Sequence, residues 1–371
     1  MKRKGRLKRA AKLFVSVILV FVAAACVFRR LPETFGNREA VLAAAAFTLT
    51  DGKYPIESGT APQTTSAVQE TVSTTAAGTV PPATSAQNKE KPKQRDKSGY
   101  YDTDADHSGE EVYDIAEKTI AGSGTAVDSC YIKNYAGMSL DFEGILSAPL
   151  SFQVKKSSDE PQVLIYHTHT GESYLDKDTD HFYESYYSRT NNNSFNVVAV
   201  GDVMTETLEK NGIKTLHDTT VHDSSYNGSY DRSAQTVTDD MEKYPSIKVV
   251  LDIHRDALGT ETCKVKPVFE YNGKKGAQIM IMSGCDPDNE RGFANWQNNL
   301  GFALKLQNTA EKLYPGMTRP LNFDYFAYNE YICDGSLLIE VGTDANSVDE
   351  AEYTGTLLAD VIAKVLAGEE K

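Results

Sequence analysis

The sequence predicts an α/β fold: a single domain with a mostly parallel sheet flanked by helices, within residues 126–371 of the 371-residue chain. Three short apolar runs predict buried strands, at residues 163–166, 247–253 and 337–341. Segments whose apolar residues recur at helical spacing separate these runs. Strands that alternate with helices are typical of a parallel sheet covered on both faces, and about 245 residues suit one such domain.

Helices and a hairpin complete the predicted domain. The clearest helical patterns cover residues 197–213, 230–244, 294–314 and 348–367. Turn residues end the first three of these helices, with Asn-Gly at 211–212, Pro245 and Pro-Gly at 315–316. The stretch "KPVFEYNGKKGAQIMIMSG", residues 266–284, predicts two strands joined by an Asn-Gly turn.

The first 30 residues predict a membrane anchor. Residues 1–12 carry seven basic side chains and no acidic one, and the apolar run 13–28 follows directly. Such a positive flank keeps the N-terminus in the cytoplasm, so we expect one transmembrane helix at 13–30 in the cell membrane and the rest of the chain outside the cytoplasm. A cleaved signal peptide and a lipoprotein site at Cys26 are the alternatives.

Residues 31–125 predict an extracytoplasmic linker that is largely disordered. Thr, Ser, Ala and Pro dominate residues 60–108, which show no helical or strand periodicity and have too few large apolar residues to fold. The net charge of −14 argues against a nucleic-acid partner, because phosphates attract basic surfaces.

The five cysteines are too few and too scattered for a disulfide framework, and none has the spacing of a zinc finger. Cys263 and Cys285 lie equally far in sequence from Lys274, at the turn of the predicted hairpin. One expectation is therefore a disulfide across the two strands. We prefer two separate buried thiols, since a slip of one residue in the turn would put the cysteines on opposite faces.

Chemically versatile side chains stand at the ends of the three predicted strands. His169 follows the first strand, His254 the second, and Glu340 lies near the end of the third. Carboxyl ends of parallel strands are the usual ligand-binding edge of an α/β sheet. Imidazoles and carboxylates are the ligands of a catalytic zinc, and a further carboxylate can act as its general base. The alternatives are structural: His254 as a salt-bridged surface residue, and Glu340 as the ion-pair partner of Arg255.

Four blocks of the sequence carry a resemblance to known enzymes: "VLIYHTHTGESY", "YNGSYDRS", "YPSIKVVLDIHRDA" and "IEVGTDANSVDEAE". Their order resembles that of the zinc-dependent N-acetylmuramoyl-L-alanine amidases, which cleave peptidoglycan. Residues 127–371 are more similar still to the stage II sporulation protein P family, the membrane-anchored wall hydrolases of endospore formers. The resemblance implies an amidase-like domain, and the predicted anchor and linker agree with it.

The resemblance also implies roles for individual residues. His169 and His254 match the two histidine ligands of Zn²⁺, and Glu340 matches the catalytic glutamate. The third ligand is less well defined, because the usual position reads "RTNNNSFNVV" without an acid. Glu172 is our choice for it and Glu184 the alternative.

Three further residues are expected to contact substrate or to support the ligands. His167 has no counterpart in the broader amidase pattern. Arg255 would grip a peptide carboxylate, or alternatively form a structural ion pair with Asp252 or Asp256. Asp256, in the same "DIHRDA" block, is the third residue expected to contact substrate or to support the ligands.

The implied reaction is hydrolysis of the amide that joins N-acetylmuramic acid to L-Ala, with cleavage of peptide cross-links as a possible second activity. Zinc would activate a water molecule, and Glu340 would take its proton and return it to the leaving amine. The family resemblance implies a complex with stage II sporulation proteins D and M that thins the septal wall during engulfment. A zinc peptidase acting on proteins and an inactive wall-binding scaffold are the alternative functions.

Overall fold

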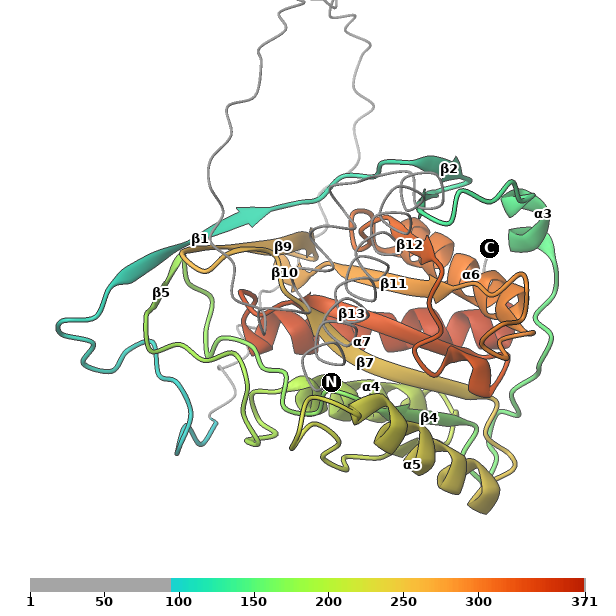
Figure 1. The fold of residues 1–371 in the computed structure, drawn as a ribbon, viewed down its shortest axis with the longest axis horizontal. Coiled ribbons are helices and arrows are strands. Elements are labelled where there is room, and N and C mark those ends of the chain that lie inside the picture. Colours follow the sequence, from blue (N-terminus) through green and yellow to red (C-terminus); the bar gives the residue numbers. More distant parts are fainter. Residues whose placement is uncertain (1–94, 370–371) are drawn as a thin grey trace, which may run out of the picture. The chain divides into compact units, whose positions relative to one another are not determined.

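Two β-sheets organise residues 95–369, the part of the chain that the computed structural model describes (Figure 1). Within these residues the larger sheet has eight strands, in the order β2 (Thr125–Val127), β3 (Cys130–Asn134), β12 (Leu321–Asp324), β11 (Ile279–Gly284), β13 (Ser336–Thr343), β7 (Val249–Asp256), β4 (Val163–Tyr166) and β6 (Thr215–His217). Strands β4, β7 and β13 are the three predicted buried strands, and they are neighbours in the sheet.

The larger sheet consists of two parallel halves that run in opposite directions. Strands β6, β4, β7 and β13 are parallel to one another, and so are β11, β12 and β3. The halves meet where β11 pairs antiparallel with β13, and β2 adds an antiparallel edge strand. The sheet is thus mixed, and the predicted parallel arrangement holds within each half.

Four long helices cover the larger sheet, as predicted. They are α4 (Val197–Lys210), α5 (Ser229–Lys243), α6 (Trp296–Leu313) and α7 (Val348–Ala367), accompanied by the short α3 (Phe142–Ser147) and the 3-10 turn η1 (Glu330–Ile332). Helices α4, α6 and α7 share one hydrophobic cluster with one face of the sheet. Helix α5 packs on the opposite face, over β4 and β7.

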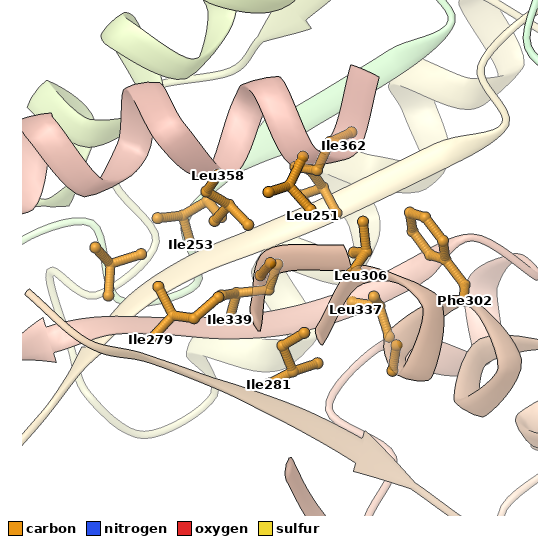
Figure 2. Close-up of a cluster of buried hydrophobic side chains, with 14 of the residues drawn as sticks. Leu251, Ile253, Ile279, Ile281, Phe302, Leu306, Leu337, Ile339, Leu358 and Ile362 are labelled. Atoms are coloured by element: carbon orange, nitrogen blue, oxygen red, sulfur yellow. The ribbon is translucent and has the colours of Figure 1, made fainter. Parts of the chain in front are cut away.

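Strand alternation separates these two faces residue by residue. Leu251 and Ile253 of β7 point toward α7, where they meet Leu358 and Ile362 (Figure 2). Val250 points the other way and joins the smaller cluster under α5. Because successive side chains in a strand alternate between faces, this core also determines which polar residues at the strand ends share a face.

A second sheet, which the sequence patterns did not predict, lies within the same compact unit. It comprises β10 (Lys274–Ala277), β9 (Cys263–Tyr271), β1 (Val112–Lys118) and β5 (His181–Tyr183), with β8 (Gly259–Thr260) paired to β9. Strands β9 and β10 form the predicted hairpin around Asn272 and Gly273, whose φ angles are 52° and 72°. Both residues have the left-handed backbone conformation. A two-residue hairpin turn needs this conformation to match the right-handed twist of the strands that it joins.

The hairpin does not bring Cys263 and Cys285 together. Its second strand ends at Ala277, and the chain then enters the larger sheet as β11, beside β13. Cys285 follows β11 and is buried, whereas Cys263 starts β9 and is half-buried; both thiols are free. The disulfide expectation is therefore wrong, and the expectation of two separate buried thiols is confirmed except that Cys263 is only half-buried.

The predicted boundary between linker and domain, at residue 125, is also wrong. The described residues from Arg95 onward belong to the compact unit, and β1 lies well inside the segment assigned to the linker. Polar contacts rather than an apolar pattern hold this segment: Lys97 Nζ lies 2.6 Å from the buried carboxylate of Asp176. Tyr100 stacks on Phe195 with 4.6 Å between ring centroids.

The predicted anchor at 13–30 lies outside the described residues, as does the linker up to residue 94. Among residues 95–369, none of the helices combines the length and the apolar character needed to cross a membrane.

Candidate active site

The ends of the three neighbouring strands β4, β7 and β13 bring together the residues singled out by the sequence. His169 lies in the loop after β4, His254 lies in β7, and Glu340 is the register partner of His254 in β13. Paired residues of adjacent parallel strands project from the same face. His254 and Glu340 therefore lie side by side on the face that α5 covers only in part.

Ring contacts place His169 against His254. Their ring centroids lie 5.4 Å apart with the planes nearly perpendicular. Tyr226 stacks on His169 at 4.6 Å with an interplanar angle of 5°, and Tyr230 meets the same ring edge-on at 5.7 Å. Both tyrosines come from the start of α5 and the loop before it, so this segment holds the His169 ring in place. Burial lowers the pKa of His169, which favours the neutral imidazole that metal binding requires.

Two carboxylates flank His254. Its Nδ1 lies 3.4 Å from Glu172 Oε2, and its Nε2 lies 2.8 Å from Asp252 Oδ1. Burial opposes protonation of His254, but the negative charges of Asp252 and Glu172 outweigh it and raise the pKa well above its ordinary value. In the same way, burial alone would raise the pKa of Glu172, yet Arg255 and His254 lower it to about 2. An ionised glutamate thus lies beside a histidine that holds an extra positive charge.

Glu340 is the acid with the most unusual environment. Burial, assisted by the nearby charges of Glu172 and Asp256, raises its pKa to about 8, although His254 acts in the opposite direction. Its Oε2 atom is shielded from solvent and has no hydrogen-bond partner within residues 95–369. Raised carboxyl pKa values of this kind are typical of residues that transfer protons near neutral pH.

The donor set around His254 suits a divalent metal ion. His169, His254 and Glu172 offer two imidazoles and a carboxylate, the combination that binds catalytic zinc. His254 Nδ1 faces Glu172, whereas Nε2 faces Asp252, so Nδ1 is the nitrogen that a cation shared with Glu172 would meet. A cation would also neutralise the two carboxylates that now raise the pKa of His254. These side chains are of the types that bind zinc, although within residues 95–369 only the Glu117–Asp178–Glu350 group has ligand atoms that all lie within 4.8 Å of one another.

A separate group of carboxylates near the smaller sheet is not a comparable metal site, because lysine side chains already neutralise it. The carboxylates of Glu117, Asp178 and Glu350 have oxygens within 4.8 Å of one another. Lys266 Nζ lies among them, 2.9 Å from Glu117 and 3.7 Å from Glu350, and Lys275 Nζ lies 2.8 Å from Glu117. Two ammonium groups already occupy the position that a cation would take.

The structure separates the two candidates for the third ligand. Glu172 lies in the loop after β4, 7 % exposed, where its Oε2 accepts the Arg255 backbone N–H at 3.2 Å. Glu184 follows β5, its side chain is exposed, and its backbone pairs with Glu111. The carboxylate beside His254 is therefore Glu172.

His167 lies on the other face of the sheet and does not reach the centre. The alternation along β4 directs it toward α4, where its Nε2 lies 2.9 Å from His217 Nε2 and its Nδ1 lies 2.8 Å from the Ile253 carbonyl oxygen. Burial and the neighbouring His217 lower its pKa to about 3. Since the side chain is fully buried, the expectation that it faces a substrate is wrong.

Arg255 fills neither of its two predicted roles. It follows His254 in β7, so alternation turns its side chain to the opposite face, where it is 7 % exposed and donates to the Ser188 carbonyl oxygen at 2.8 Å. A buried guanidinium cannot grip a peptide carboxylate, and neither Asp252 nor Asp256 forms an ion pair with it. Asp256 instead pairs with Arg319 at 2.8 Å, and remains close enough to Glu340 to raise the pKa of that carboxyl.

Several residues of the centre escaped the sequence patterns. Asp252 is two positions before His254, and the period of a strand would have placed both on one face. Arg189, whose Nη2 lies 3.5 Å from Glu172 Oε1 and whose guanidinium lies over the Tyr226 ring, comes from an irregular loop. Tyr226 lies in the loop before α5, and Tyr230 lies in the first turn of α5, where helical spacing did not indicate that it faces the site. Loop residues of this kind have no periodicity from which their position could be read.

Comparisons with known proteins agree with the sequence blocks. The protein described as Stage II sporulation protein P from Bacillus subtilis (strain 168) is 28% identical over 232 residues, which cover 58% of this chain and 53% of that protein. The chain thus spans about half the length of this curated relative.

Two solved structures are similar to part of this chain at low identity. The CwlD amidase from Clostridioides difficile in complex with the GerS lipoprotein has a TM-score of 0.32 and 13% identity, with 56% of this chain and 99% of that chain covered. An N-acetylmuramoyl-L-alanine amidase from Clostridium difficile 630 has a TM-score of 0.32 and 16% identity, with 57% and 97% covered. The family model described as Stage II sporulation protein P matches residues 42–363, and the chain belongs to this family.

Proposed function

We propose that this chain is a zinc-dependent peptidoglycan hydrolase of sporulation that cleaves the amide between N-acetylmuramic acid and L-Ala. The observation that carries the proposal is the grouping of His169, His254 and Glu172 beside Glu340 at the ends of adjacent parallel strands. Family membership supports a role in sporulation. The resemblance of the strand-end blocks to zinc-dependent amidases supports the amide as the bond that is cleaved.

His169, His254 and Glu172 are the residues that would hold the zinc ion. Bound there, zinc supplies a Lewis acid that makes a water molecule more acidic and polarises the carbonyl of the amide. The protein's part is to keep the donor atoms in place. Tyr226 stacks on the His169 ring, and the Arg255 backbone N–H holds the Glu172 carboxylate.

Glu340 is the proton carrier in this proposal. Its carboxylate accepts the proton of the attacking water and then delivers it to the amine of L-Ala as the amide breaks. A carboxyl whose pKa lies near neutral pH can accept and release a proton within one turnover, and the raised pKa of Glu340 supports this role. Asp252, beside His254 on the same face, keeps negative charge next to the imidazole and so strengthens it as a ligand.

The proposal includes a membrane location and partners. The basic residues 1–12 and the apolar run 13–28 support a single anchor with the hydrolase outside the cytoplasm. A complex with stage II sporulation proteins D and M rests on the family resemblance alone.

Digestion of purified cell-wall sacculi tests the reaction. The full-length chain, loaded with zinc, is incubated with sacculi, and mass spectrometry identifies the released products. We expect intact stem peptides that start at L-Ala, and none from the Glu340→Gln variant. Shortened or un-cross-linked peptides without free L-Ala would indicate an endopeptidase instead. Absence of any release would favour a wall-binding scaffold.

A further inference from the structure

We propose that Tyr328 positions the substrate by packing its ring against the N-acetylated sugar that carries the scissile amide. The inference rests on the proposed function, since it assigns the sugar side of the same site. In the loop between β12 and η1, Tyr328 has a φ of 34° and Asn329 a φ of 61°. Positive φ values are uncommon for asparagine and exceptional for a bulky aromatic residue.

Asn329 ties this strained turn to α5. It is 5 % exposed, and its Nδ2 donates to the Tyr230 carbonyl oxygen at 3.2 Å and to Ser233 Oγ at 3.0 Å. The surrounding structure therefore determines the left-handed conformation, which a chain keeps only where contacts outweigh the strain. Glycine at position 328 would follow the same path without strain. The presence of tyrosine there needs a reason other than the turn.

The turn places the Tyr328 ring at the edge of the candidate active site. The ring is tilted against Tyr230 with centroids 5.4 Å apart, and Tyr230 in turn lies nearly parallel to the His254 ring at 6.5 Å. Phe326 supports Tyr328 from the loop itself, at 4.7 Å. Because Tyr328 is still 37 % exposed, it extends a row of rings from His254 to the solvent. A ring this exposed adds little to the core, but it is accessible to a bound molecule.

The charges around Tyr328 indicate which part of the substrate it meets. After burial, the groups that raise the pKa of Tyr328 include Glu340, Glu330 and Asp324, all acidic. The strongest electrostatic influences on Tyr328 include no basic side chain, so this side offers no evident partner for the carboxylates of a stem peptide. The muramoyl sugar is neutral once its lactyl carboxyl is part of the amide, and the C–H faces of a sugar pack well on an aromatic ring. Tyr325 and Tyr331 are also exposed in the same segment.

Three variants of the full-length chain test the proposal. Tyr328→Gly removes the ring and the strain together, whereas Tyr328→Phe removes only the hydroxyl. Asn272→Gly changes another left-handed residue, in the β9–β10 turn away from the site, and serves as the control. The probe is a peptide-free tetrasaccharide of alternating N-acetylglucosamine and N-acetylmuramic acid whose lactyl carboxyls are capped as methylamides, and its affinity is measured by titration calorimetry. Thermal unfolding of each variant is recorded alongside.

We expect Tyr328→Gly to unfold at the same or a higher temperature than the unchanged chain, because the strain is removed. Its affinity for the tetrasaccharide should fall roughly tenfold, as loss of an aromatic contact implies. Tyr328→Phe and Asn272→Gly should bind within about twofold of the unchanged chain. Full affinity in Tyr328→Gly, or a loss in Tyr328→Phe equal to that in Tyr328→Gly, would refute the packing role. A marked fall in unfolding temperature would also refute it, because the ring would then support the fold.

Binding of the tetrasaccharide needs no turnover, so the two proposals can fail separately. If the chain bound the sugar through Tyr328 but released no peptide from sacculi, only the proposed reaction would be wrong. Amidase products together with unchanged sugar affinity in Tyr328→Gly would overturn only the role of Tyr328.

Discussion

Replacement of Glu340 by glutamine should stabilise the metal-free protein at high pH. Glutamine has nearly the same shape but carries no charge. In the folded chain the pKa of Glu340 is raised from its ordinary 4.5 to about 8, so the folded state favours the neutral acid. As pH rises through this window the unfolded state releases the proton first, and the unchanged protein loses stability relative to the variant.

The size of the effect follows from the same shift. A difference of one in pKa between the folded and the unfolded state corresponds to about 1.4 kcal/mol of unfolding free energy. The raised pKa of Glu340 therefore changes the free energy of unfolding by at most about 5 kcal/mol. The side chain is partly exposed, and solvent screening reduces this figure to about 2 kcal/mol. For a domain of this size, such a difference raises the unfolding temperature by roughly 4–8 °C at pH 9. Below pH 4.5, where both states hold the proton, the difference should vanish.

Thermal unfolding in the presence of a chelator measures this effect at pH 4, 6 and 9. Glu184→Gln is the control, because Glu184 is an exposed glutamate away from the site. Equal stability of Glu340→Gln and the unchanged chain at pH 9, or a difference that grows as pH falls, would refute the reasoning. With zinc present, Glu340→Gln should still bind the metal but lose roughly two or more orders of magnitude in turnover. Loss of zinc would identify Glu340 as a ligand instead.

Three further changes have direct outcomes. His169→Ala and His254→Ala should each lose stoichiometric zinc and activity, as elemental analysis would reveal; a full zinc complement in either variant would contradict the ligand assignment. Asp176→Ala should lower the free energy of unfolding by about 1–3 kcal/mol in a denaturant titration, because it removes the buried acceptor of Lys97 and Thr103, and a change within about 0.5 kcal/mol would show that the segment before β1 adds little. Alkylation of the unfolded, unreduced chain should modify both Cys263 and Cys285, and protection of this pair would reveal a disulfide.

The sequence patterns located the three strands that end at the candidate active site, because each strand is marked by a short local run of apolar residues. The apolar runs that became β4, β7 and β13 each end in a histidine or a glutamate, and adjacent parallel strands necessarily bring such ends together. Successive side chains of a strand face opposite sides of the sheet. This rule would also have placed Arg255 on the face opposite to His254. Our expectation for Arg255 failed because the charge of the side chain was considered without the face from which it projects.

What the patterns missed depends on contacts between distant segments. Strand β1 pairs with β9, far along the chain, and the residues before β1 are held by ion pairs and a stacked tyrosine rather than by a hydrophobic period. Composition alone therefore assigned them to the linker. Arg189 and Tyr328 reach the site from irregular loops, where neither helical nor strand spacing applies. The place of such loop residues at the site can be known only once the whole fold is known.

The location of the metal tests the central claim most directly. Crystals of the zinc-loaded full-length chain would be measured with X-rays above and below the zinc absorption edge, so that anomalous scattering marks the ion. We predict a single strong peak bonded to His169, His254 and Glu172, with Glu340 beside it and unbonded. A peak at the Glu117–Asp178–Glu350 group, or no peak near His254 in a catalytically active preparation, would contradict the account.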